Sequence, residues 1–353
     1  IGRFSYALIL PAMQEDQRWS YEVASWLNTA NALGYIGGAI SCLLVLRVLN
    51  AGQVFRLGLV TSAAAILLTG VLPNWWWLLS SRVLAGCGAA WTFAAGGAVV
   101  AAAYRADPRR SSLASGIFFS GAGLGMVLSA LIAPSLTAFQ GPSAWPLTWV
   151  ALGAASCVLA VFPFRASCNV DAFGAKANSG SGSAATPSRW VLPTIAYLTF
   201  AFSHTVYIFF VFAWAKEVGV PWYLGASMWV VLGLGVLASP FLWQRALRTW
   251  NPNWVLGGCC LQTWIGATLP LASSSASILF ASALLVGTSF FMAPTAVAVL
   301  GRFWGAAGGW GWRAQPPRLH RAGSLQRRQV SRQRRDRLRV EMRERRHVRA
   351  RLQ

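Results

Sequence analysis

Two arginines lie in segments of the sequence that otherwise avoid charge. Arg3 belongs to an apolar segment at residues 1–13, and Arg82 opens the stretch RVLAGCGAA within an apolar run at residues 75–104. A charged side chain at membrane depth is costly, so it usually faces a cavity or a partner. The apolar segments contain no Asp or Glu. Two cations without embedded carboxylates favour an anionic solute group such as a carboxylate, which the planar guanidinium binds through two hydrogen bonds.

Other polar side chains could line the same cavity. Asn28 and Asn31 are three residues apart and share one helix face, with Tyr35 another turn on, and Tyr6 follows Arg3 by three residues. We therefore predict a solute-binding group made of Arg3, Tyr6, Asn28, Asn31 and Arg82. The alternative is that the asparagines join helices through hydrogen bonds, and that Arg82 binds backbone carbonyls or polar side chains of neighbouring helices.

One histidine lies in an apolar segment. His204 is near the middle of residues 190–215, and Tyr207 follows one turn later. Because histidine titrates near physiological pH, His204 and Tyr207 are the candidates for coupling solute movement to protons. A lone histidine in a helical bundle can equally be held by simple hydrogen bonds. The sequence shows no metal cluster, phosphate-binding loop or nucleophile–base arrangement, so we expect no enzyme activity, no cofactor and no metal.

The elements that must position these residues are membrane helices. Of the residues, 56% are hydrophobic and only 11% are charged, against roughly 25% charged in soluble domains. A spanning helix needs about 20 apolar residues, and lipid offers the backbone no other hydrogen-bond partners. We predict an all-α polytopic membrane protein with ten spans, at residues 1–13, 23–46, 54–73, 75–104, 112–137, 146–164, 190–215, 222–244, 253–272 and 275–300.

The distribution of basic residues predicts an orientation. Connections from an even to an odd span contain ten Lys and Arg side chains, and the opposite connections contain only Arg18 and Lys216. Basic residues concentrate on the cytoplasmic side, so the even-to-odd connections are predicted to be cytoplasmic. They include residues 165–189, a Ser-, Gly- and Ala-rich stretch typical of a flexible linker.

Several motifs resemble a known family. The stretch LLSSRVLAGCGAA, residues 78–90, is similar to a fourth-helix motif of the major facilitator superfamily in its Arg82, Gly86 and Gly88. Four more stretches of the sequence are similar to a bacterial subgroup of efflux permeases in that superfamily. They are IGRFSYALILPAM (1–13), WLNTANALGYIGGA (26–39), FFSGAGLGMVLSALIAP (118–134) and LLVGTSFFMAP (284–294). The resemblance covers roughly residues 1–302.

The resemblance implies an organisation and an activity. It implies a six-helix half at 1–164, a cytoplasmic linker at 165–189 and a partial half of four helices at 190–300. The chain would be a secondary transporter of a small organic solute, working by alternating access as a monomer in the bacterial inner membrane. Conformational roles would fall to small residues in the fourth and fifth spans, namely Gly86, Gly88, Gly121, Gly123 and Gly125.

Two departures from the superfamily affect the type of transporter. The stretch LRVLNAGQVFRLG keeps Arg47, Gly52 and Arg56 but lacks the aspartate that the superfamily often carries after its second helix. Gly123-Leu124-Gly125-Met126 stands where antiporters usually have Gly-Pro. Both departures count against a drug/proton antiporter, and neither affects the predicted fold.

The end of the sequence has a different composition from the rest. Residues 301–353 contain 16 Arg, no Lys and three acidic residues, a formal charge of +13. One interpretation of this tail is a frameshift or truncation that replaced two helices and would impair transport. A second interpretation is a cytoplasmic arm that binds anionic lipid, and a third, less favoured, is an arm that binds nucleic acid. The rival function is therefore a non-transporting membrane protein with a basic binding tail. At the other end, the start of the chain inside a helix predicts an incomplete N-terminus.

Overall fold

The structure, a computed structural model, describes residues 1–104, 108–168, 188–297 and 300. These residues belong to one compact unit. Predictions for the tail at 301–353, and for most of the linker at 165–189, lie outside the described residues. Residues 165–168 end one helix and residues 188–189 begin the next.

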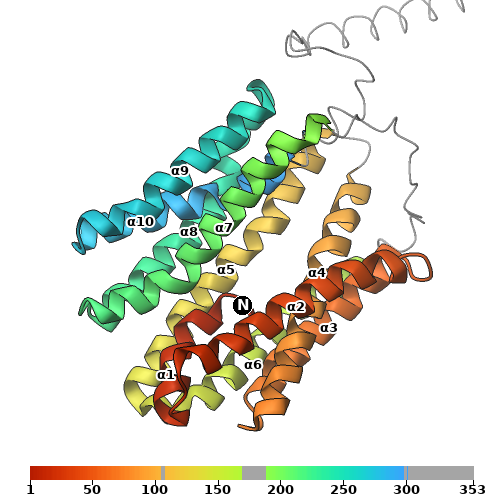
Figure 1. Ribbon diagram of the computed structural model, residues 1–353. Helices are drawn as coiled ribbons and strands as arrows, with labels where there is room; N and C mark the ends of the chain where they lie inside the picture. Colours follow the sequence, from red (N-terminus) through yellow and green to blue (C-terminus); the bar gives the residue numbers. More distant parts are fainter. Residues whose placement is uncertain (105–107, 169–187, 298–299, 301–353) are drawn as a thin grey trace, which may run out of the picture. The chain divides into compact units, whose positions relative to one another are not determined.

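Within the described residues the structure is helical and contains no strand (Figure 1). The predicted all-α class is therefore confirmed. The helices in order are α1 (Ser5–Gln17), α2 (Tyr21–Val45), α3 (Ala51–Thr69), α4 (Trp75–Ala103), α5 (Pro108–Gln140), α6 (Trp145–Cys168), α7 (Ser188–Glu217), α8 (Trp222–Thr249), α9 (Pro252–Ala272) and α10 (Ala276–Ser289), with a short 3-10 helix η1 (Pro142–Ala144) before α6.

Eight of the described helical segments are long and apolar enough to cross a membrane. They correspond to α3 through α10, the last of them counted to Val297. The helix α1 has 13 residues, which is shorter than the roughly 20 residues that a span needs. The helix α2 is long enough at 25 residues, but polar residues such as Asn28, Thr29 and Asn31 lower its hydropathy.

The last predicted span contains a break, although its described part counts as one segment long and apolar enough to cross a membrane. The helix α10 ends at Ser289, residues 290–291 form a turn, and residues 292–297 are helical again. The cause lies four residues beyond the break. Pro294 has no backbone N–H, so it cannot donate to the carbonyl of Phe290, and its ring crowds that carbonyl. Thr295 then donates to Phe291 at 3.2 Å, which restarts the helix.

Side-chain caps fix where several helices begin. Asn50 accepts from the backbone of Gln53 at 2.8 Å, and the Gln53 side chain accepts from the backbone of Asn50, which completes a capping box at α3. Asn74 caps α4 by accepting from Trp76 and Trp77. Ser20 accepts from Val23 at the start of α2. These short polar residues satisfy backbone donors that the first turn leaves free.

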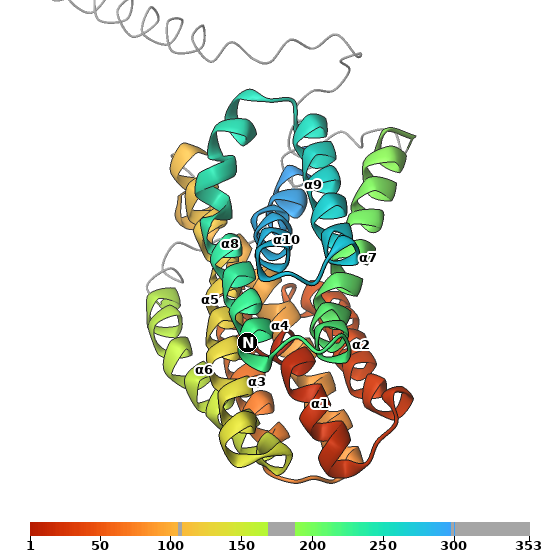
Figure 2. The ribbon, with the colours of Figure 1, turned by 90° about the vertical axis from the view of Figure 1, so that its left-hand side faces the viewer.

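The helices form two groups that meet along α5 and α8. In the first group α2 and α3 pack on α4, and α3 also packs on α6. In the second group α10 packs between α8 and α9, and α7 packs on α9 (Figure 2). Across the two groups, α5 packs along α8 and α1 contacts α7. Figure 1 shows α7–α10 gathered on one side, with α5 running beside α8.

Glycine allows the closest helix contacts. A Cβ atom on Gly86 of α4 would lie 2.1 Å from the backbone oxygen of Asn31 in α2. A Cβ atom on Gly123 of α5 would lie 2.4 Å from the backbone oxygen of Gly233 in α8. Neither contact could form with a larger residue, because the obstacle in each case is backbone. The first contact joins two helices within one group, and the second lies at the joint between the groups.

Candidate functional site

Arg3 lies between the two groups of helices. It precedes α1, and its guanidinium carbon is 5.6 Å from the centre of the Tyr35 ring in α2. The same guanidinium is close enough to Tyr197 and His204 of α7 to interact with them electrostatically. Arg3 is half-buried and has no hydrogen bond or ion pair with any residue that the structure describes. Its N–H donors are therefore available to a ligand.

Aromatic side chains surround the histidine beside Arg3. The His204 ring stacks on Phe200 at 5.7 Å and meets the edge of Phe290 at 3.9 Å, in an arrangement close to perpendicular. Phe4 contacts Phe290 at 5.5 Å, and Tyr197 stacks on Phe200 at 6.3 Å. His204 is 7% exposed. Neither of its ring nitrogens has a hydrogen-bond partner among the described residues, so a buried polar group stands unsatisfied in an apolar wall.

We call this arrangement the central site. It consists of Arg3, Tyr35, Tyr197, His204 and Phe290, which come from the start of the chain, α2, α7 and the break after α10. Arg3 supplies a cation with free donors, and the rings supply apolar surface. A cation with free donors beside aromatic surface has the chemistry that would suit a small anion with an apolar body.

Arg82 has a different environment, although it gave the same signal in the sequence. Its side chain is fully buried. Its Nη1 donates to the backbone oxygen of Gly2 at 2.9 Å, and its guanidinium carbon lies 5.1 Å from the Tyr6 ring and 4.9 Å from the Trp149 ring. Its Nε and Nη2 have no acceptor among the described residues. The contacts with a carbonyl and two rings match the alternative in which Arg82 joins neighbouring elements.

The other predicted solute contacts lie around Arg82. The Tyr6 hydroxyl donates to the backbone oxygen of Ala24, and the Tyr6 ring stacks on Trp149 at 6.5 Å. Asn31 donates to the backbone oxygen of Arg82 at 3.0 Å, so it joins α2 to α4. Asn28 is half-buried. The five predicted residues thus divide into Arg3 in the central site and a packed group that includes Tyr6, Asn31 and Arg82.

Tyr207 is engaged inside the second group of helices. Its hydroxyl is 2.7 Å from the Ser282 hydroxyl of α10, and Ser282 donates to the backbone oxygen of Gly266 in α9 at 2.6 Å. This chain of hydrogen bonds joins α7, α10 and α9. Tyr207 therefore has a structural partner, whereas His204 one turn away has none in the described part of the chain.

The predicted conformational glycines have different surroundings. Cβ atoms added on Gly86, Gly88 and Gly123 would come within 2.1–2.6 Å of backbone atoms on neighbouring helices. A Cβ atom added on Gly125 would lie 2.6 Å from the Ile1 nitrogen. An added Cβ on Gly121 would meet nothing within 4 Å. Four of the five glycines are therefore close-contact positions, and Gly121 is not.

Sequence reasoning missed Tyr197, Phe200 and Phe290. A signal existed for the first two, because Tyr197 and Phe200 lie seven and four residues before His204 on one helix face. The place of Phe290 depends on the break after α10 and on the packing of α10 against its neighbours, which a single sequence does not reveal.

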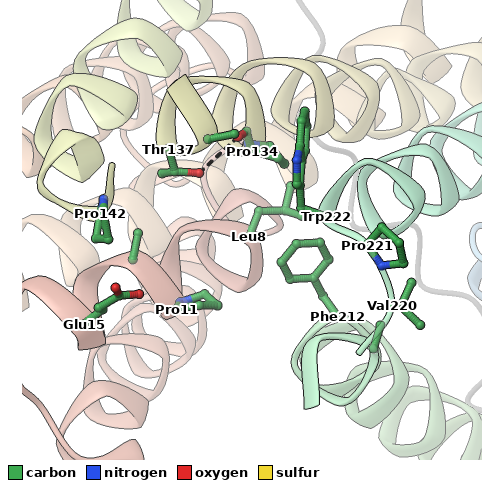
Figure 3. A pocket seen from close by; sticks show the side chains of 14 residues that line it. Leu8, Pro11, Glu15, Pro134, Thr137, Pro142, Phe212, Val220, Pro221 and Trp222 are labelled. Atoms are coloured by element: carbon green, nitrogen blue, oxygen red, sulfur yellow. Dashed lines mark hydrogen bonds between the residues drawn. The ribbon is translucent and has the colours of Figure 1, made fainter. Parts of the chain in front are cut away.

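A hollow lies away from these residues. It has a volume of about 260 Å³ and is lined where α1, α5, α7 and α8 converge (Figure 3). The lining includes residues beside the α1–α2, α5–α6 and α7–α8 connections, so these connections lie at the same end of the bundle. None of the predicted site residues lines it.

The comparisons with known proteins agree with this architecture. The family model described as "Uncharacterised MFS-type transporter YbfB" matches residues 1–309. The chain therefore belongs to this family of major facilitator superfamily transporters, and it is a multi-pass membrane protein. A search of curated proteins found no match.

Solved structures show the same fold at low identity. A bacterial homolog of the human lysosomal transporter Spinster, inward-facing and unoccupied, has 15% identity and a TM-score of 0.53, covering 86% of this chain and 76% of that one. The inward-facing and occupied form of a bacterial Spinster homolog has 18% identity and a TM-score of 0.58, covering 84% and 69%. At these identities the likeness shows the fold alone.

Proposed function

We propose that the protein is a secondary transporter that moves a small organic anion by alternating access. In this proposal it is a monomer in the bacterial inner membrane, with residues 165–189 and the basic tail in the cytoplasm. The observation that carries the proposal is Arg3, a half-buried cation between the two helix groups with no acidic partner in the described residues. Charged groups at membrane depth commonly mark a solute pathway.

The central site suggests how such an anion binds. A carboxylate placed at Arg3 can accept two hydrogen bonds from the guanidinium. The unpartnered nitrogens of His204 offer a further hydrogen bond. The rings of Tyr35, Tyr197 and Phe290 can then enclose an apolar or aromatic body. The favoured solute is therefore a small monocarboxylate with an apolar body.

Arg82 enters this proposal chiefly as a positioning residue. Its bond to Gly2 fixes the backbone directly before Arg3, and Tyr6 and Trp149 hold the guanidinium in place. Its Nε and Nη2 donors, which have no acceptor among the described residues, are a possible second contact for an anion.

Alternating access requires the two helix groups to rock against each other. The contact between Gly123 and Gly233 lets α5 and α8 approach backbone to backbone, so it is the proposed pivot. His204 is the proposed coupling residue because it lies on a helix of the opposite group and close enough to Arg3 to interact with its charge. A proton on His204 would add a second cation beside Arg3 and would strengthen binding of an anion. Tyr207 would act by holding α7 to α10.

The proposal is tested by uptake of radiolabelled phenylacetate into proteoliposomes that contain the full chain. Benzyl alcohol serves as a neutral probe of similar shape. Arg3→Gln should reduce uptake by about 10- to 100-fold, the value of hydrogen bonds to a charged group. Arg18→Gln is the matched control, because Arg18 is exposed in the α1–α2 connection. The proposal fails if phenylacetate does not enter, or if Arg3→Gln transports it as well as the unaltered chain.

A further inference from the structure

The hollow shown in Figure 3 has a lining unlike that of the central site. Its walls come from both helix groups, with Leu8, Pro11 and Glu15 on α1, and Phe212 and Trp222 on α7 and α8. Its volume of about 260 Å³ lies just below the usual range for ligand pockets. A ligand in it would be small and would touch both groups at once.

The charge of this lining has one sign. Glu15 is the single ionisable residue among those that line the hollow. It is exposed and has no hydrogen bond or ion pair with any side chain that the structure describes. Glu15 also borders an adjoining hollow with Trp19 and Tyr21. An anion is therefore disfavoured here, and a cation would find an unpaired carboxylate.

Aromatic rings face the carboxylate. Figure 3 shows Glu15 on one side of the hollow, with Phe212 and Trp222 across it. Aromatic faces attract cations, and rings are the usual recognition surface for quaternary ammonium groups. The Glu15 carboxylate adds the attraction between opposite charges. The remaining walls are apolar residues such as Leu8 and Pro134, which suit a hydrocarbon body.

We propose that this hollow is a binding site for a small organic ammonium ion with an apolar body. The ammonium group lies between the Glu15 carboxylate and the rings of Phe212 and Trp222, and the body packs against Leu8 and Pro134. Because the ligand bridges α1 and α5 to α7 and α8, it holds these helix ends together. The site is separate from the central site in both position and sign of charge.

The test is a titration of the purified full chain with benzyltrimethylammonium, followed by saturation-transfer NMR. Benzyl alcohol and phenylacetate are the neutral and anionic probes of similar body. Saturable binding of the ammonium ion is expected to be stronger than binding of either analogue. Glu15→Gln and Trp222→Leu should each weaken it by about two- to fivefold, as expected for partly exposed contacts.

Matched controls lie outside both hollows. Glu22→Gln removes an exposed carboxylate of α2, and Trp254→Leu removes an exposed ring of α9; both should leave the affinity unchanged. Size-exclusion profiles establish that each variant is folded. Equal binding of benzyl alcohol, or unchanged binding in both Glu15→Gln and Trp222→Leu, overturns the proposal. Arg3→Gln should leave this affinity intact, so the site and the proposed anion transport can fail separately.

Discussion

The surroundings of Arg82 and of Arg3 differ although both arginines stand alone in apolar sequence. Arg82 is fully buried, bonds a backbone carbonyl and lies near two aromatic rings. Arg3 is half-buried, faces Tyr35 and makes no hydrogen bond or ion pair with the described residues. One is surrounded by the first helix group, and the other lies between the groups. An arginine that stands alone in apolar sequence can therefore have either of two kinds of surroundings, and its spatial neighbours distinguish them.

The largest expected effect is on the free energy of unfolding, which should respond differently to the loss of Arg82 and of Arg3. Arg82→Ala should lower the free energy of unfolding by about 2–5 kcal/mol, because it empties a large buried volume and removes the bond to Gly2. Arg3→Ala should change stability by less than about 1 kcal/mol, because its side chain is only half-buried. Thermal unfolding in detergent, followed by size-exclusion chromatography, measures both. Equal losses for the two variants would contradict the distinction.

A second prediction compares a close-contact glycine near Arg82 with an exposed glycine of α5. Gly86→Ala places a Cβ atom 2.1 Å from the Asn31 backbone oxygen, one turn from Arg82, and should cost about 1–3 kcal/mol through overpacking. Gly121→Ala is the matched control, since its Cβ would meet nothing within 4 Å; it should be neutral or stabilising by up to about 1 kcal/mol. If Gly86→Ala unfolds at the same temperature as Gly121→Ala, the close packing of α2 on α4 does not contribute to stability.

The smallest expected effect on stability concerns the two polar residues of α7. Tyr207→Phe removes the hydrogen bond to Ser282 and should lower stability by about 1 kcal/mol, with transport little changed. His204→Phe removes a buried group with unpartnered nitrogens and should keep or raise stability, but should abolish uptake driven by a pH gradient. Paired uptake and melting measurements decide this. Gradient-driven uptake that survives in His204→Phe and is lost in Tyr207→Phe would reverse the two roles.

Most of the fold was predictable because its signals are local in sequence. Each apolar segment is mainly helical, with the last one interrupted at 290–291, since a run of apolar residues between capping residues such as Asn50 and Asn74 needs no tertiary information. The break at 290–291 was marked by Pro294. Proline alone is an insufficient signal, however, because α1, α5 and α8 continue through Pro11, Pro134 and Pro240.

The candidate site was predictable only in part. The sequence located Arg3 and His204, because charge and histidine are rare in the apolar segments. It could not place Trp149 beside Arg82, since the two residues are 67 positions apart and their contact depends on how α6 and α4 pack. It also could not show that Asn31 and Tyr6 already have backbone partners. Partners of this kind are set by helix–helix contacts rather than by spacing along one helix.

The anchor of Arg82 on Gly2 has a consequence for how this protein tolerates sequence change. The acceptor is a main-chain oxygen, and every amino acid supplies the same atom. Replacements at position 2 therefore leave the acceptor in place, provided that the Ile66 side chain yields to the added bulk. A mutational scan of the start of the chain would therefore not detect the hydrogen bond between Arg82 and Gly2. Only substitutions in α4 would reveal it.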